Sequence, residues 1–193
     1  KRLINSVIRK CVQCKKLRGK LCTQQMADLP KDRLTPSPPF SYVGVDAFGP
    51  WPVTFRRTRG GVSQSKRWAL LFACLVTRAI HLEVIEELSS SSFINAWRRF
   101  IALRGPVRQV RSDRGTNFVG ATQDLSMIAQ FVEDRNVQNF LNDNRITWQF
   151  NPPHASHFGG AWERLIGVSR RILDSLLLEN RFKDFTHEML TTF

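Results

Sequence analysis

The sequence predicts an α/β fold in which helices flank a mixed β-sheet. Three strand-like segments come first, at 42–46, 68–76 and 79–85. Helical and strand-like segments then alternate along the rest of the chain, a pattern typical of layered α/β domains. Hydrophobic residues make up 42% of the 193 residues, which is enough to form a core and argues against disorder.

The strands are predicted from apolar runs and their boundaries. Residues 68–76 read WALLFACLV, an almost unbroken apolar run that suits a central strand buried on both faces. Residues 79–85 follow closely enough to pair with it as a hairpin. Residues 56–67 are basic and rich in glycine, so we expect a loop there. Two further short strands are expected at 107–112 and 146–150.

The helices are predicted from caps and apolar spacing. Ser89 to Ser92 can cap a helix that continues to about Leu103, and Gly105-Pro106 ends it. Further helices are expected at about 119–132, 136–143 and 160–178.

The chain divides into four predicted parts. Residues 1–27 are basic and begin with apolar residues at helical spacing, and residues 28–41 form a proline-rich linker. A compact core is expected over 42–180. Residues 181–193 then begin a C-terminal extension, and we interpret the chain as a segment of a longer protein.

Charge and cysteine content limit the function classes. The chain has 29 Lys and Arg against 16 Asp and Glu, a net charge of +13, which favours a polyanionic partner over a merely basic surface. The cysteine distribution is unlike a secreted disulfide framework, so an intracellular setting is expected. No apolar stretch reaches the roughly 18 residues of a membrane span, and we expect no membrane partner.

Three carboxylates occupy similar settings. Asp46 ends the first strand, Asp113 ends the strand after the first core helix, and Glu163 opens the last long helix. Each aspartate alone could be a turn former or a ligand. If the three meet at one rim of the sheet, each pair at about 4 Å costs roughly 4 kcal/mol at an effective dielectric constant of 20. Such a cluster requires cations, and hard oxygen ligands favour Mg²⁺ or Mn²⁺.

Three sequence stretches carry a family resemblance. YVGVDAFGP, SDRGTNFVGA and FNPPHASHFGGAWERLIG together resemble the catalytic core of retroviral-type integrases, most closely those of BEL/Pao-like LTR retrotransposons. The resemblance spans about residues 11–178. It implies a ribonuclease H-like fold and a polynucleotidyl transferase that uses two divalent ions, Mg²⁺ or Mn²⁺. The family's acidic triad corresponds to Asp46, Asp113 and Glu163.

The resemblance also implies partners and a location. These are double-stranded DNA (element ends and target), further copies of the chain in a homo-oligomer, and the nucleus. We expect arginines to neutralise DNA phosphates without reading bases, although each could simply be solvated. These candidate DNA-binding residues are Arg56, Arg57, Arg59, Arg114, Arg164, Arg170 and Arg171. Arg114 departs from the asparagine common in retroviral members, and we favour phosphate binding over competition with the metal.

Two cysteines resemble half of a zinc site. The family's N-terminal module binds Zn²⁺ with two histidines followed by two cysteines, and Cys11 and Cys14 match the cysteine pair. All four histidines of this chain lie downstream of them. Zinc binding is therefore expected only in a longer chain that has the upstream histidines.

Other polar residues near these motifs have competing interpretations. His154 and His157 precede Glu163 and could be general bases, but we favour a loop or phosphate-contact role. Glu83, Glu86 and Glu87 could imitate active-site acids, but they lie on one short stretch and we expect them to form a solvated edge.

The sequence leaves two rival functions open. One is a domesticated or decayed integrase-derived protein that binds DNA without catalysis. The other is a ribonuclease H-like nuclease that cuts DNA without joining it.

Overall fold

In the computed structural model, the described residues are 2–18, 28–58, 61–113, 127–152, 159–180 and 186–192. The strands are β1 (Tyr42–Thr58), β2 (Gly61–Cys74), β3 (Ile80–Ile85), β4 (Gln109–Ser112) and β5 (Thr147–Phe150). The helices are α1 (Arg2–Lys10), α2 (Val12–Arg18), α3 (Lys31–Leu34), α4 (Ser90–Arg104), α5 (Met127–Glu133), α6 (Arg135–Asp143), α7 (Gly160–Asn180) and α8 (His187–Thr192). None of the described helices is both long and apolar enough to cross a membrane.

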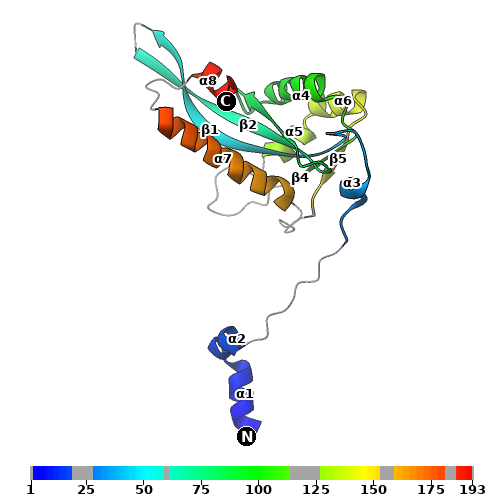
Figure 1. The fold of residues 1–193 in the computed structure, drawn as a ribbon, viewed down its shortest axis with the longest axis vertical. Helices are drawn as coiled ribbons and strands as arrows, with labels where there is room; N and C mark the ends of the chain where they lie inside the picture. The colour runs from blue at the N-terminus through cyan, green and yellow to red at the C-terminus, as the bar shows by residue number, and fades with distance from the viewer. Residues whose placement is uncertain are drawn as a thin grey trace.

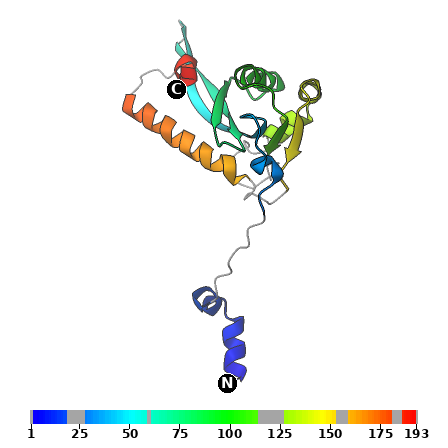
Figure 2. The same cartoon turned by 45° about the vertical axis from the view of Figure 1, so that its right-hand side comes forward.

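The five strands form one mixed sheet in the order β3-β2-β1-β4-β5. β1, β2 and β3 pair antiparallel, whereas β4 is parallel to both β1 and β5. Figures 1 and 2 show α7 along one face of the sheet and α4, α5 and α6 on the other. The mixed sheet flanked by helices is the architecture predicted from the sequence.

Alternating side chains of the sheet build two apolar layers. Val43 and Val45 face the larger layer, which contains Trp97 and Phe100 of α4. The smaller layer lies beneath α7 and is built around the fully buried Trp162. Residues 69–75 are all buried, which confirms that the apolar run forms a central strand covered on both faces.

The expected loop at 56–67 was wrong. The backbones of β1 and β2 stay paired almost to the turn, with Arg57 opposite Val62 and Thr58 opposite Gly61. The two strands thus form a long hairpin that extends beyond the body of the sheet in Figure 1. Basic and glycine residues suggested a loop, but pairing with the neighbouring strand satisfies the backbone polar groups of this segment, so its composition did not prevent strand formation.

Helix α4 confirms the capping prediction. The Ser89 hydroxyl accepts a hydrogen bond from the Ser92 backbone N–H (3.3 Å), and Gly105 ends the helix with a φ of 91°. That positive φ suits glycine, which has no Cβ to clash.

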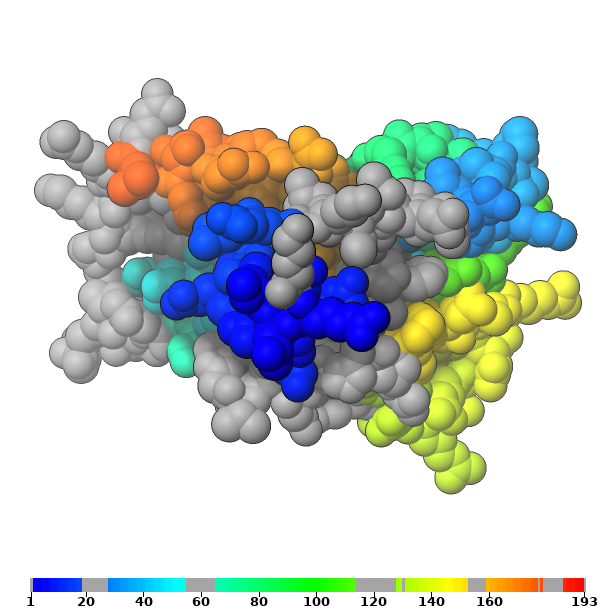
Figure 3. All heavy atoms as spheres, turned by 90° about the horizontal axis from the view of Figure 1, so that it is seen from below, coloured from blue at the N-terminus to red at the C-terminus, as the bar shows by residue number. Residues whose placement is uncertain are grey.

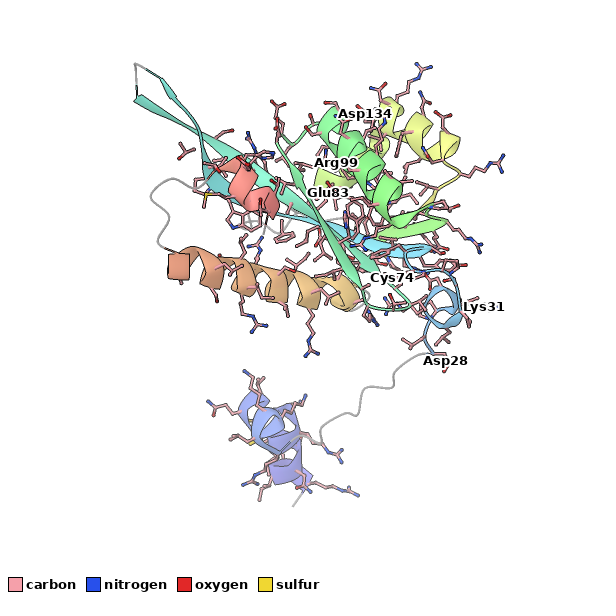
Figure 4. All side chains as sticks on the ribbon, turned by 45° about the horizontal axis from the view of Figure 1, so that its top comes forward. Asp28, Lys31, Cys74, Glu83, Arg99 and Asp134 are labelled. Atoms are coloured by element: carbon pink, nitrogen blue, oxygen red, sulfur yellow. The ribbon has the colours of Figure 1, made fainter. Side chains whose placement is uncertain are left out.

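The expectation of a solvated edge was wrong for Glu83. The residue is only 8% exposed, and its carboxylate accepts hydrogen bonds from Arg99 Nε (2.6 Å) and His81 Nε2 (2.9 Å). Figure 4 shows Glu83 on β3 and Arg99 on α4 close to each other. Position 83 lies on the face of β3 that α4 covers, so the carboxylate is paired there with a cation.

The predicted linker residues contact the core. Asp32 of α3 is buried and forms an ion pair with Arg111 of β4. Phe40 is also buried, and its ring packs edge-on against Phe100 at 5.5 Å. By contrast, α1 and α2 contain no buried residue.

Candidate functional site

The parallel register of β1 and β4 brings two of the predicted carboxylates together. Gly44 of β1 lies opposite Arg111 of β4. Two residues further along each segment is an aspartate, Asp46 after Gly44 and Asp113 after Arg111. Residues in register on parallel strands share a face, and neighbouring strands lie about 4.8 Å apart. The two aspartates therefore lie side by side on the face covered by α7.

Helix α7 brings the third carboxylate to this face. Trp162, in the first turn, is fully buried against β1, and a Cβ built on Gly44 would lie 2.2 Å from its ring. Only glycine at position 44 permits this close contact between strand and helix. Glu163 is the next residue and its side chain is exposed. The Gly44–Trp162 contact thus positions Glu163 over β1.

Asp113 is held by two neighbours that sequence reasoning did not single out. Asn151, after β5, is 3% exposed and donates from Nδ2 to Asp113 Oδ1 at 2.6 Å. Its backbone N–H donates to the Ser112 carbonyl at 2.9 Å. On the other side, a Cβ on Gly159 would lie 2.5 Å from Asp113 Oδ2. Both residues lie within the FNPPHASHFGGAWERLIG stretch, which was the only signal for them.

The charges of the three carboxylates act on one another. Burial, together with the charges of Asp113 and Glu163, raises the pKa of Asp46 to about 7, against a hydrogen bond from the Ala47 N–H (2.8 Å) and the charge of Arg170. Burial, followed by the charge of Asp113, raises the pKa of Glu163. The structure therefore brings the predicted acidic residues into electrostatic contact.

Burial also raises the pKa of Asp113, opposed by its hydrogen bond from Asn151 and by the nearby Trp162 indole. The Trp162 Nε1 atom itself is buried without a hydrogen-bond partner among the described residues. We therefore assign the orientation of the Asp113 carboxylate to Asn151, whose 2.6 Å contact has full hydrogen-bond geometry.

The donor set fits a hard divalent cation in its chemistry. Three carboxylates from separate segments repel one another. A cation between them would reduce both this repulsion and the free-energy cost of keeping Asp46 ionised in a buried position. Across the described ranges, however, no group of three His, Cys, Asp or Glu side chains is arranged to hold a metal ion. The three carboxylates are thus within range of one another's charge but do not form one coordination shell here.

The structure places three of the candidate arginines on α7. Arg170 lies with its guanidinium 5.5 Å from the centre of the Phe48 ring, close enough to Asp46 to lower its pKa. Arg164 and Arg171 are exposed. Arg56 and Arg57 belong to β1 by their backbone. Their side chains lie outside the described part, as do Arg59, Arg114, His154 and His157.

The cysteine pair lies at the junction of the first two helices. Cys11 separates α1 from α2, and Cys14 lies within α2. Hydrogen bonds from the backbone and side chain of Cys14 lower the pKa of the Cys11 thiol, the direction that favours the thiolate form used by metal ligands. A role in zinc binding stays a prediction.

Comparison with known protein families gives a match to the integrase core domain over residues 47–156, more than half of the chain. The chain belongs to the integrase core domain family. The matched range contains Asp113 but starts immediately after Asp46 and ends before Glu163. None of the curated proteins compared with this integrase core matches it.

Solved structures share the fold of this integrase core. One is a cryo-EM structure of a simian T-cell lymphotropic virus intasome in complex with PP2A regulatory subunit B56 gamma (TM-score 0.58, 12% identity). That alignment covers 99% of this chain and 58% of the matched chain, so the chain spans just over half of that relative's length. Another is the HTLV-2 integrase catalytic core domain in complex with magnesium, trimeric form (TM-score 0.50, 16% identity, 73% and 74% coverage). These similarities confirm the predicted ribonuclease H-like fold.

Proposed function

We propose that this chain is the catalytic core of a BEL/Pao-like LTR retrotransposon integrase, a polynucleotidyl transferase that cuts element DNA ends and joins them to target DNA. The observation that carries the proposal is the half-buried Asp46, whose pKa is raised by burial and by two carboxylates from distant parts of the chain. A buried carboxylate with two acidic neighbours suits a group that works with bound cations.

The proposed reaction has two phosphoryl transfers. A water oxygen attacks a phosphodiester near the 3′ end of the element DNA, and the bond from phosphorus to the 3′ oxygen breaks, leaving a 3′-hydroxyl. That hydroxyl then loses its proton and attacks a target phosphodiester, and the displaced 3′ oxygen of the target takes up a proton, so the second transfer releases no net proton. Two Mg²⁺ or Mn²⁺ ions, when bound, would supply positive charge at the reacting phosphate.

The chain's own residues have distinct roles in this proposal. Asp46, oriented by the Ala47 N–H, Asp113, oriented by Asn151, and Glu163 would hold the ions. The HTLV-2 integrase catalytic core, solved in complex with magnesium, supports the choice of Mg²⁺ as the ion.

The arginines would neutralise DNA phosphates along α7, along the β1–β2 hairpin and next to Asp113 in the sequence. Their proposed members are Arg56, Arg57, Arg59, Arg114, Arg164, Arg170 and Arg171. Double-stranded DNA, a homo-oligomer, a nuclear location and a zinc module completed by upstream histidines belong to the same proposal, and the similarity to an intasome chain supports the first two.

A strand-transfer assay with labelled DNA ends tests the proposal. Wild-type protein with Mg²⁺ or Mn²⁺ should give joined products, and Asp113→Asn should reduce them by at least 100-fold while leaving the fold intact by circular dichroism. Asp143→Asn, an exposed change on α6, is the matched control and should retain activity. Cut but unjoined products would instead indicate a nuclease.

One observation favours a second function, that of an integrase-derived DNA-binding protein without catalysis. The three carboxylates do not form one coordination shell among the described residues. In that case neither cut nor joined products would appear, and Asp113→Asn would leave DNA affinity unchanged.

A further inference from the structure

A pocket lined by arginines lies at the amino ends of the parallel strands. Its volume is about 420 Å³, and it opens beside the start of β1 and the residues before β4. Three exposed arginines and three prolines form most of its wall: Arg104, Arg108, Arg145, Pro38, Pro39 and Pro106. Among the described residues, no acidic side chain lines it. A pocket wall that carries positive charge and is stiffened by proline favours the binding of an anion.

Arg104 is oriented by the core rather than free to rotate. Its Nε donates to His81 Nδ1 at 3.3 Å, and its guanidinium lies 5.3 Å from the centre of the Phe40 ring. His81 in turn contacts the buried Glu83 through Nε2. These contacts use one edge and one face of the guanidinium and leave its terminal amino groups as donors.

The same end of the molecule carries an excess of positive charge. Burial lowers the pKa of Arg33, and the charges of Arg78 and Arg111 lower it further, while Asp32 opposes them. Asp32 itself is already paired with Arg111. The cations here are therefore close enough to repel one another, and an added polyanion would relieve that repulsion.

The chain segments that carry these residues meet at one end. Figure 4 shows Lys31 of α3 and Cys74, at the end of β2, at the same end of the molecule. Figure 3 shows the light-blue segment from α3 to β1 at the right-hand end of the view. The green segment around α4 and β4 and the yellow segment around α6 and β5 lie at the same end.

This end is distinct from the carboxylate site. Ser41, which lines the pocket, precedes Asp46 by five residues, and Arg108 precedes Asp113 by five. At about 3.3 Å per residue, each aspartate lies roughly 16 Å further along its strand. The pocket arginines are also not among the arginines proposed above to contact DNA at the carboxylate site.

We infer that this pocket binds backbone phosphates of duplex DNA at a position separate from the carboxylates. Guanidinium groups bind phosphate oxygens through paired N–H donors, and such contacts do not depend on base sequence. The choice of DNA as the polyanion rests on the proposed function. The pocket gives the core a second duplex contact at the opposite end of the parallel strands.

Two double variants with equal charge loss test the inference. Arg108→Gln with Arg145→Gln removes two pocket cations and spares Arg104, whose contacts support the core. Arg98→Gln with Arg135→Gln removes two exposed cations from α4 and α6 that do not line the pocket. Binding of a labelled duplex is measured by fluorescence anisotropy at several KCl concentrations in EDTA, so that no cutting occurs, and circular dichroism checks folding.

The pocket variant should bind duplex DNA at least fivefold more weakly than the control variant at moderate salt. The slope of log affinity against log salt should fall by about one for each phosphate that the variant no longer neutralises. Equal decreases in affinity in the two variants would overturn the inference, because only total charge would then matter. A decrease confined to single-stranded RNA would overturn it as well.

The outcome is separable from that of the proposed function. Without joined products in the strand-transfer assay, the transferase proposal fails, yet a selective decrease of duplex affinity in the pocket variant would still support this site. Joined products together with equal decreases in the two variants would keep the transferase and remove the second DNA site.

Discussion

At the scale of single residues, Asp46 is an acid that the folded chain keeps from ionising easily. Its pKa is about 7 in the folded protein, against about 3.9 for an unperturbed aspartate. Between these two values the folded state holds a proton that the unfolded state has released, so this residue makes stability fall as pH rises from about 4 to 7. Above pH 7 the full cost remains, with an upper bound of about 4 kcal/mol.

Asp46→Asn should therefore stabilise the metal-free protein at pH 8, by roughly 1–4 kcal/mol. The asparagine oxygen can still accept the Ala47 N–H hydrogen bond, while the buried charge is gone. The gain should shrink as pH falls and vanish below about pH 4. Thermal unfolding followed by circular dichroism from pH 4 to 8 in EDTA measures it.

Divalent ions should remove or reverse the stability advantage of Asp46→Asn over the wild type. Millimolar Mg²⁺ or Mn²⁺ should raise the wild-type Tm at pH 8 and leave that of Asp46→Asn nearly unchanged, since a ligand that binds the folded state stabilises it. Asp143→Asn, on the exposed side of α6, serves as the control and should respond as wild type does. A wild-type Tm that changes neither with pH nor on addition of Mg²⁺ would contradict the assigned role of Asp46.

Asn151 orients Asp113 through a single hydrogen bond. Asn151→Ala removes the 2.6 Å donor, and outer contacts of this kind change metal affinity or activity by roughly 10–100-fold. We expect weaker Mn²⁺ binding by isothermal titration calorimetry and a matching decrease in activity. Asn139→Ala, an exposed change on α6, should change neither. Unchanged Mn²⁺ affinity in Asn151→Ala would show that Asp113 needs no such support.

At the scale of secondary-structure elements, the contact between β1 and α7 decides where Glu163 lies. Gly44→Ala would place a methyl group 2.2 Å from the Trp162 ring, and both the strand and the ring are buried. Overpacking of this kind costs about 1–3 kcal/mol and should displace the first turn of α7. We expect a lower Tm and reduced divalent-ion binding.

Gly167→Ala is the matched control for Gly44→Ala. A Cβ at Gly167, also in α7, meets nothing within 4 Å, and alanine favours the helix over glycine by roughly 0.5–1 kcal/mol. The two Gly→Ala changes should therefore move Tm in opposite directions. If both lowered Tm equally, the close Gly44–Trp162 contact would not be the cause.

Some secondary-structure elements could be predicted from the sequence, whereas others depend on contacts between elements. Local signals were sufficient for α4, because its serine cap and Gly105 stop act within a few residues. The β1–β2 hairpin was missed beyond residue 46, because backbone pairing between the two strands overrode local composition. Glu83 was misjudged for a related reason, since its partner Arg99 comes from another element.

The candidate site shows the same division. Asp46, Asp113 and Glu163 were picked out because each lies in a quoted motif, and in the structure their charges act on one another. Asp46 was expected to end the first strand, but it lies inside β1, which continues to Thr58. Asn151, Gly159 and Gly44 act through atomic contacts across the sheet. Residue type and spacing carry no measure of such distances, so these supports could be read only from the fold.

At the scale of the whole molecule, the N-terminal residues differ in how they relate to the core. Helices α1 and α2 bury no residue, whereas α3 contributes the buried Asp32. Removal of residues 1–27 should therefore leave the Tm of the core within about 2 °C of wild type. Removal of residues 1–36 should lower it by about 5 °C or more, because Arg111 is then without its buried ionic partner.

Asp32→Asn in the untruncated 193-residue chain separates the effect of the ion pair from the effect of chain length. It should reproduce most of the decrease in Tm seen on removing residues 1–36, since the partner charge of Arg111 is absent in both. Thermal unfolding by circular dichroism at one protein concentration compares the three variants with wild type. A large decrease already on removing residues 1–27 would mean that the first two helices pack on the core in solution, and the domain boundary at residue 28 would have to move.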